Sequence, residues 1–200
     1  MTQSTPALSD TAGYVVVAHI NTKAETLQEQ HPGCTVIDVT SKAKLPWQKF
    51  SPFYPHGAIP VPTADGLTSA SVEGIWQGLK VFELQSTDCK KLEKTDMRDL
   101  KRFPTKVRGK VLGHALNLDP DSTAPEKLLG YVAARRQIYL PAYRTVLDRM
   151  QEEIAELRRF QRENGLVLLD YGTNDDVEDE RTPLSHAGLI KLYLEGRYPE

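Results

Sequence analysis

The sequence contains little cysteine and no long hydrophobic run. Cys34 and Cys89 are the only two cysteines in 200 residues, too few for a disulfide framework or a cysteine-ligated zinc site. No stretch approaches the roughly 20 consecutive apolar residues that span a bilayer. Residues 1–12 lack the basic flank and apolar core of a secretory signal. These absences predict a soluble, cytoplasmic protein with a flexible leader at residues 1–12.

The sequence also lacks an excess of charge of either sign. It has 25 basic and 27 acidic residues, which gives a formal net charge of -2. A general DNA-binding protein is expected to have a strong positive field, which this composition does not provide, although a nucleic acid can still be a substrate. With 40% hydrophobic and 26% charged residues, the chain can bury one ordinary core. We therefore expect a single domain over residues 13–200.

Hydrophobic patterning predicts an α+β domain with a small mixed sheet and several packed helices. β-branched and apolar runs predict strands at 14–20, 35–39 and 166–171, the first of them buried on both faces. Helical spacing and capping residues predict helices at 23–30, from Ser69 or Ser71 to about Leu84, at 86–102, 125–139 and 141–161, and after Thr182 or Ser185. Pro141 is expected to start or kink its helix, and residues 119–125 to form a surface loop.

Segment 41–62 is unusual because it combines five prolines with several large aromatic side chains. Proline at this density prevents a helix and removes donors from a β-ladder, so the segment is expected to be an ordered, irregular loop. Long aromatic loops in compact domains are often functional. The aromatic side chains therefore either anchor the loop in the core or stack on a ligand.

A polar stripe follows this loop. Glu73, Gln77 and Lys80 are spaced by four and three residues, which places them on one side of the expected helix beside Trp76. Glu73 alone is most simply an exposed helix carboxylate. The motifs around it favour another interpretation, in which the stripe and part of the loop line one pocket.

The order and spacing of these motifs resemble the NADAR family. Phe50-Ser51-Pro-Phe53, His56-Gly57 and Ser71-Val-Glu73-Gly-Ile-Trp-Gln77-Gly-Leu-Lys80 are similar to the family's F-S-x-F motif, its β-hairpin and its S/T-x-E-h-x-x-Q-x-x-K motif at a helix start. The segment 104–114 is similar to a small-residue stretch of the family, and Asn174-Asp175 resembles its N-D pair. Arg181 to His186 stands where the family has W-G-x-G. The resemblance runs from Phe50 onward, and its specific part ends at Lys80.

This resemblance implies hydrolysis of an N-glycosidic bond. The family is associated with removal of ADP-ribose from guanine bases and with cleavage of phosphorylated ribosylamine-type pyrimidine intermediates. The expected partner is an ADP-ribosyl or ribosyl-phosphate conjugate, free or on DNA, and neither a cofactor nor a metal is expected. The leaving base and the oligomeric state remain open.

The residues suit such chemistry. Cleavage of an N-glycosidic bond builds positive charge on the ribose, and Glu73 is the candidate carboxylate to stabilise that charge and to orient water. Gln77 can fix ribose hydroxyls, while Lys80 can bind phosphate, tune Glu73 or attack an opened sugar as an amine. Asp175 is a further catalytic candidate. Substrate-binding candidates are Trp47, Phe50, Ser51, Phe53, Tyr54, Gln77, Arg108, Asn174 and His186.

Several of these residues have simpler interpretations. His56 and His186 lack partners at metal-ligand spacing, so hydrogen-bonded or surface histidines are expected. The acidic run 175–180 is typical of a solvated face and lacks the glycine spacing of a calcium loop. Tyr139 and Tyr143 are expected to pack in the core and not to touch a substrate.

Two other classes of function fit the same sequence. One is a catalytically silent module that binds ADP-ribose or a related nucleotide, as a sensor or sequestering protein. The other is a structural interaction protein, which would show an exposed aromatic loop and no concave pocket around Glu73.

Overall fold

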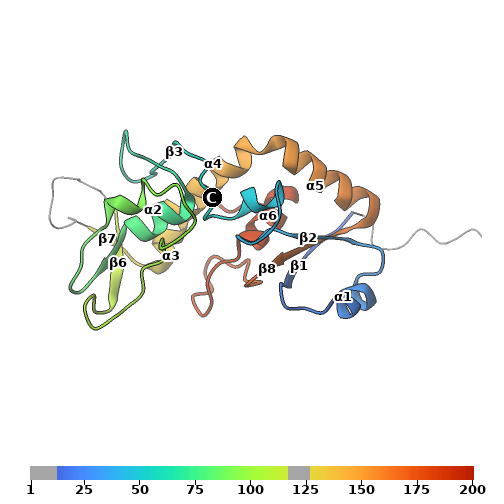
Figure 1. Ribbon diagram of the computed structural model, residues 1–200, viewed down its shortest axis with the longest axis horizontal. Coiled ribbons are helices and arrows are strands. Elements are labelled where there is room, and N and C mark those ends of the chain that lie inside the picture. Colours follow the sequence, from blue (N-terminus) through green and yellow to red (C-terminus); the bar gives the residue numbers. More distant parts are fainter. Residues whose placement is uncertain (1–12, 117–126) are drawn as a thin grey trace, which may run out of the picture.

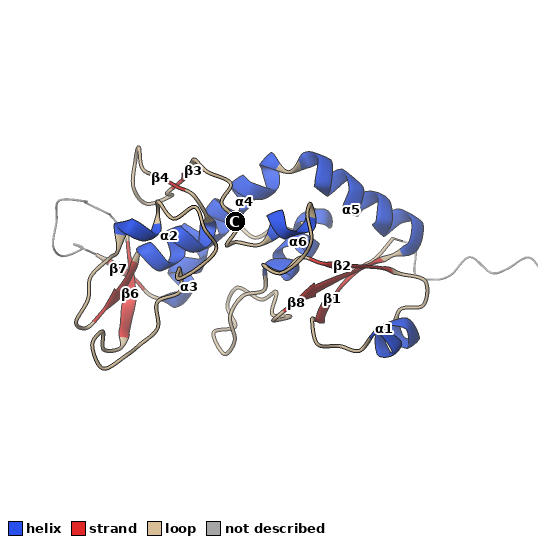
Figure 2. Cartoon of the chain, viewed as in Figure 1, coloured by secondary structure: helices blue, strands red, loops and turns tan. Residues whose placement is uncertain are grey.

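Helices and short strands alternate along a computed structural model that describes residues 13–116 and 127–200 (Figures 1 and 2). The α+β class expected from the sequence is confirmed. The expected leader at 1–12 and the expected loop at 119–125 fall outside the described residues. Within the two described ranges, no helix is both long enough and apolar enough to cross a membrane.

One end of the molecule holds a parallel sheet. In the described residues it has the order β1-β8-β2, formed by β1 (Val15–His19), β8 (Leu166–Asp170) and β2 (Thr35–Asp38). Helix α1 (Ala24–Gln30) connects β1 to β2. The central strand β8 is the one buried on both faces, whereas β1 is partly exposed because it lies at the edge. Parallel pairing brings the carboxyl ends of the strands, including His19 and Asp170, to one edge of the sheet.

The opposite end carries antiparallel strands (Figure 1). β5 (Lys80–Phe82), β6 (Val111–Ala115) and β7 (Leu128–Leu129) pair in that order, and β3 (Ile59–Pro60) pairs with β4 (Thr68–Ser69). Ser71 caps helix α2 (Val72–Gly78) by accepting a hydrogen bond from the Gly74 amide at 3.0 Å. The helix expected to reach Leu84 ends early, because Lys80 to Phe82 pair with β6 instead.

The helix expected at 86–102 is wrong. In its place there is a single turn, η2 (Cys89–Lys91), within an irregular segment. The buried Arg102 guanidinium donates to the carbonyls of Gln77, Lys80 and Ser86, and this holds the segment against α2 and β5. These hydrogen bonds to other segments stand in place of the backbone hydrogen bonds of the helix that the local charge pattern suggests.

A broken line of helices joins the two ends. It comprises α3 (Tyr131–Ala134), the π-helical turn η3 (Arg135–Tyr139), α4 (Leu140–Arg149) and α5 (Gln151–Asn164). The line begins at Tyr131 because Leu128 and Leu129 pair with β6. Pro141 lacks an N–H, and its ring would clash with the carbonyl of Gln137 in a regular helix. The helix does not start at Pro141, as one of the two expectations had it, but continues through it, and the widened turn η3 ends two residues before the proline.

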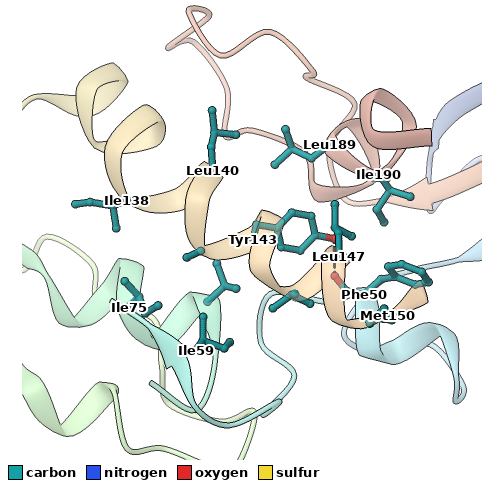
Figure 3. Close-up of a cluster of buried hydrophobic side chains, with 14 of the residues drawn as sticks. Phe50, Ile59, Ile75, Ile138, Leu140, Tyr143, Leu147, Met150, Leu189 and Ile190 are labelled. Carbon is teal, nitrogen blue, oxygen red and sulfur yellow. Dashed lines mark hydrogen bonds between the residues drawn. The ribbon is translucent and has the colours of Figure 1, made fainter. Parts of the chain in front are cut away.

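The hydrophobic core surrounds α4 (Figure 3). Ile75 of α2 lies on one side of α4, and Leu189 of α6 (His186–Leu194) lies on the other. The Tyr143 hydroxyl donates to the Phe50 carbonyl at 2.7 Å, which ties the proline-rich loop to α4. Of the two caps expected for the last helix, Thr182 and Ser185, Ser185 caps α6 by accepting from the Gly188 amide.

Candidate functional site

A cavity of about 930 Å³ lies between the two ends of the molecule. Its walls come from α2, β6, the turn η3 and the carboxyl edge of the parallel sheet, so segments far apart in the sequence meet there. The volume lies within the range of small-molecule sites. Seven of the residues expected from the sequence line it: Ser51, Phe53, Glu73, Gln77, Lys80, Asn174 and His186.

Glu73 lies in the first turn of α2, and its side chain faces the cavity although it is almost completely buried. Its amide donates to the Pro52 carbonyl at 2.8 Å, which fixes the aromatic loop to the start of the helix. Gln77 Nε2 donates to Glu73 Oε1 at 2.8 Å. Burial raises the pKa of Glu73, and Gln77 and the ammonium groups of Lys101 and Lys80 offset that shift only in part.

The orientation of the Gln77 amide is fixed from the opposite side. Its Oε1 accepts from the Arg102 backbone N–H at 2.8 Å and from Lys80 Nζ at 2.9 Å. Since a backbone N–H can only donate, the oxygen must face Arg102, which leaves the amide nitrogen toward Glu73. Of the Gln77 amide group, only the second N–H of the nitrogen is therefore left to contact a substrate, as was expected of this residue.

Lys80 lies in β5 and not on the helix, yet its side chain returns to the polar stripe. Besides Gln77, it donates to the Arg102 carbonyl at 3.3 Å. Burial lowers the pKa of Lys80 to about 8, even though Glu73 favours its charged form. Lys80 is therefore an ammonium group that loses its proton close to neutral pH.

A second polar cluster lies at the carboxyl end of β8. Asp170 Oδ2 accepts from Ser185 Oγ at 2.7 Å and lies 3.0 Å from His186 Nδ1, and the Val39 carbonyl lies 2.8 Å from His186 Nε2. Because both ring nitrogens of His186 face acceptors, both carry protons, and the ring is an imidazolium. Burial lowers the pKa of His186, but Asp170 and the Val39 carbonyl outweigh that effect and raise it overall. Burial raises the pKa of Asp170, but the charge and hydrogen bond of His186 leave it below its ordinary value.

The aromatic part of the loop does not reach the cavity, apart from Phe53. Phe50 is buried in the core and stacks on Trp47, whose ring also packs against Phe160. Tyr54 packs against His56. Trp47 and Phe50, expected to bind substrate, therefore anchor the loop, which is one of the two interpretations given to them. Tyr54, also expected to bind substrate, contacts its own loop and not the cavity.

Two further candidates lie outside the cavity. Arg108 donates to Gln85 and to the Phe103 carbonyl on an exposed turn. Asp175 pairs with Lys191 of α6 at 3.0 Å, where the missing side chain of Gly188 lets its backbone approach.

Asn174 does line the cavity, but its amide nitrogen donates to the carbonyls of Asp179 and Thr182, and its oxygen accepts from the Asp176 amide. These bonds give Asn174 a role in shaping its own loop.

The chain matches a protein family over residues 19–190, described as a family of unknown function (DUF6939). It belongs to that family. The matched range includes every residue that lines the cavity, from His19 to His186. No curated protein matches the sequence.

Several residues that line the cavity were not predicted from the sequence. Tyr139, expected in the core, lines the cavity together with Trp76 and Tyr131. The sequence predicts Asp170 only as a strand residue, although an acidic residue that ends an apolar strand is a usable signal. In the described part of the chain, no group of three or more His, Cys, Asp or Glu side chains is placed to hold a metal ion.

Proposed function

We propose that this chain is an N-glycosidase. It hydrolyses the bond between the ribose of an ADP-ribosyl or ribosyl-phosphate group and a nucleobase or related amine. The observation that carries the proposal is the position of Glu73, a buried carboxylate at the wall of a ligand-sized cavity, held through Oε1 by an oriented amide. Within the described residues, its Oε2 has no hydrogen bond and is available to a ligand or a water molecule.

Glu73 suits the transition state of glycoside cleavage. As the bond to the base breaks, positive charge develops on the ribose, and a preorganised carboxylate in a water-poor site stabilises that charge far better than water does. Burial also raises the pKa of Glu73, which makes its carboxylate a stronger base than an exposed one. The same group can therefore take a proton from the attacking water.

Lys80 supports this arrangement through Gln77. Its ammonium group and the Arg102 backbone N–H together hold the amide that positions Glu73. Because its pKa is about 8, Lys80 can also exchange a proton near neutral pH. Lys80 can still bind phosphate, tune Glu73 or attack as an amine. Its hydrogen bond to Gln77 supports the second role, tuning of Glu73.

Product release from defined substrates tests the proposal. The protein is incubated with an oligonucleotide that carries ADP-ribosylated guanine and, separately, with free ribosyl-phosphate conjugates of bases, and released ADP-ribose or sugar phosphate is measured by chromatography. Glu73→Gln is the inactive comparison. Glu156→Gln is the matched control, because Glu156 is an exposed carboxylate on α5 that pairs with Arg159 on the same helix.

We expect release by the wild type and by Glu156→Gln, and none above background by Glu73→Gln. Tight binding of these conjugates without any release would contradict the hydrolase and identify a binding module. Equal release by both variants would remove Glu73 from the mechanism.

A further inference from the structure

One wall of the cavity is aromatic, and the chemistry assigned to Glu73 does not use it. Trp76 lies at its centre, with the Tyr131 ring 5.9 Å away at 61° and the Tyr139 ring 5.7 Å away at 77°. His114 lies against Trp76, with ring centroids 3.9 Å apart and ring planes tilted by 33°. All four rings line the cavity. Since His114 covers part of Trp76, a ligand can meet only what remains exposed of that ring.

The π-helical turn keeps this wall in register. Residues four apart in an α-helix are offset by about 40° around the axis, so Tyr131, Arg135 and Tyr139 would drift steadily around a regular helix. The wider turn from Arg135 to Tyr139 reverses the offset over its own length. Tyr131 and Tyr139 therefore both face Trp76. Such turns are rare and are frequently found at functional sites.

The aromatic wall carries no charge of its own. Burial, together with Lys80 and Arg102, lowers the pKa of His114 to about 3, and its two buried ring nitrogens have no partner in the described residues. Burial raises the pKa of Tyr139 well above its ordinary value, and Glu73 and Asp170 add to the shift. Imidazole and phenol are thus both neutral near physiological pH, and the carboxylates of Glu73 and Asp170 both act on Tyr139.

Cations of the protein already occupy the neighbouring aromatic faces. The Arg135 guanidinium lies 4.3 Å from the centre of the Tyr131 ring, and Lys101 Nζ lies 5.4 Å from that of Phe53. Lys80 and the His186 imidazolium line the cavity as well. A ligand ring with its own positive charge would find the cation–π position on Tyr131 already filled. The carboxylates in the same lining are engaged as well, Asp170 by His186 and one oxygen of Glu73 by Gln77.

We propose that Trp76, Tyr131 and Tyr139 form the subsite for the leaving group, and that this group is an uncharged planar heteroaromatic ring. The inference rests on the proposed function, since it assigns the base-binding half of the same site. Aromatic side chains hold bases by stacking, which tolerates different bases and does not need a charge. These three rings take the stacking role that the sequence suggested for Trp47 and Tyr54, whose rings pack within the protein away from the cavity.

Tryptophan fluorescence isolates this subsite. Trp47 and Trp76 are the only tryptophans in the sequence, and Trp47 packs against Phe50 and Phe160 away from the cavity. The Trp47→Phe protein therefore reports on Trp76 alone. It is titrated with guanosine and cytidine as neutral rings, with the N-methylnicotinamide cation as a charged ring, and with ribose 5-phosphate as a ligand without a ring, with correction for ligand absorbance.

We expect saturable quenching by at least one nucleoside, binding of the cation at least about tenfold weaker, and no ring-type signal from ribose 5-phosphate. Tyr131→Ala and Tyr139→Ala, added to the Trp47→Phe protein, should each weaken nucleoside binding about tenfold. Trp76→Phe, which keeps Trp47, should show no saturable change. Circular dichroism and thermal unfolding establish that each variant is folded.

Two results would overturn the subsite: no saturable quenching by any neutral ring, or binding of the cation as tight as that of the nucleosides. The result is separable from the proposed function. If the Trp47→Phe protein releases ADP-ribose while no ring quenches Trp76, the hydrolase stands and the subsite fails. If neutral rings quench Trp76 but no conjugate is hydrolysed, the subsite stands and the hydrolase fails.

Discussion

At the scale of single residues, Glu73 gives the sharpest expectation. Glu73→Gln keeps the shape of the side chain and removes the charge that would stabilise the transition state. Turnover should fall on the order of a hundredfold or more, while ground-state affinity should change far less, because such preorganised groups act mainly on the transition state. Single-turnover rates and equilibrium binding of the same conjugate measure the two effects separately. A Glu73→Gln protein with wild-type turnover, or one that loses only affinity, would contradict the mechanism.

Lys80 makes the activity sensitive to alkaline pH. Its pKa is about 8 because it is buried, so its ammonium form predominates below that pH and is lost above it. Since the charged form donates to Gln77, we expect turnover to decline as the pH rises through about 8. Lys80→Arg, which stays charged, should remove that decline even if its overall rate is lower. A rate that increases through the same range would instead assign Lys80 the role of a free amine.

The Asp170–His186 pair links stability to pH in two directions. The pKa of His186 is raised in the fold, so its contribution is complete below its ordinary value of 6.5 and is lost as the pH rises through the folded value. The pKa of Asp170 is lowered, so its contribution is present above 3.8 and is lost as the pH falls through the folded value. Urea unfolding of the wild type should therefore show falling stability above pH 6.5, and His186→Gln should flatten that slope. Asp170→Asn should cost about 3 kcal/mol near pH 6.

The sequence predicted one of the two polar clusters. The spacing of Glu73, Gln77 and Lys80 was enough to bring them together, although Lys80 arrives from a strand and not from the helix. Asp170 and His186 belong to different elements, β8 and α6, and only the docking of α6 against β8 brings them within 3.0 Å. Local spacing carries no information about such a contact.

At the scale of elements, Pro141 tests whether one residue sets the aromatic wall, because the π-helical turn η3 ends just before it. In Pro141→Ala the backbone N–H returns, and a regular helix would no longer press a proline ring against the Gln137 carbonyl, so a regular helix becomes available. We expect stability to stay equal or to increase by about 1 kcal/mol, while nucleoside binding at Trp76 weakens because Tyr139 turns away from Tyr131. Urea unfolding and fluorescence titration of the Trp47→Phe, Pro141→Ala protein measure both. Unchanged binding together with a regular helix in its structure would separate the turn from the subsite.

The same scale explains the expected elements that did not form. A run of charged residues with helix-favouring side chains predicted a helix at 86–102. Arg102 is instead buried and donates three hydrogen bonds to the carbonyls of Gln77, Lys80 and Ser86. Strands β1, β2 and β8 and the capped helices α2 and α6 were predictable because their signals are local. Whether a charged side chain is solvated or buried depends on the segments that pack over it, and the pattern at 86–102 does not contain that information.

At the scale of the whole molecule, one wall of the cavity is a loop that leaves the parallel sheet and is bound by the π-helical turn η3. Residues 173–183 follow the parallel sheet and contribute Thr173, Asn174, Asp179 and Thr182 to the cavity wall. Arg135 of the π-helical turn holds this loop: its guanidinium donates to the carbonyls of Val177, Asp179 and Thr182, each at 2.8 Å. The acidic run expected to be a solvated face keeps Asp176, Glu178 and Glu180 exposed, and its backbone is held by Arg135.

Arg135→Lys tests whether this attachment shapes the site. A lysine is a single point donor and cannot span three carbonyls in the way a planar guanidinium does, so buried acceptors lose their partners. We expect the loop to open locally, trypsin to cut faster after the exposed Arg181, and ligand affinity to fall, with a loss of about 1–3 kcal/mol in the free energy of unfolding.

The adjacent arginine supplies the control. Arg136 is exposed and pairs with Glu178 on the surface, so Arg136→Lys makes the same chemical change where little stability depends on it. It should leave the rate of cleavage after Arg181 and the ligand affinity close to wild type. Equal cleavage rates for the two variants would show that the loop keeps its place without Arg135. The cavity wall would then depend on the amide of Asn174, which contacts the carbonyls of Asp179 and Thr182 from within the loop.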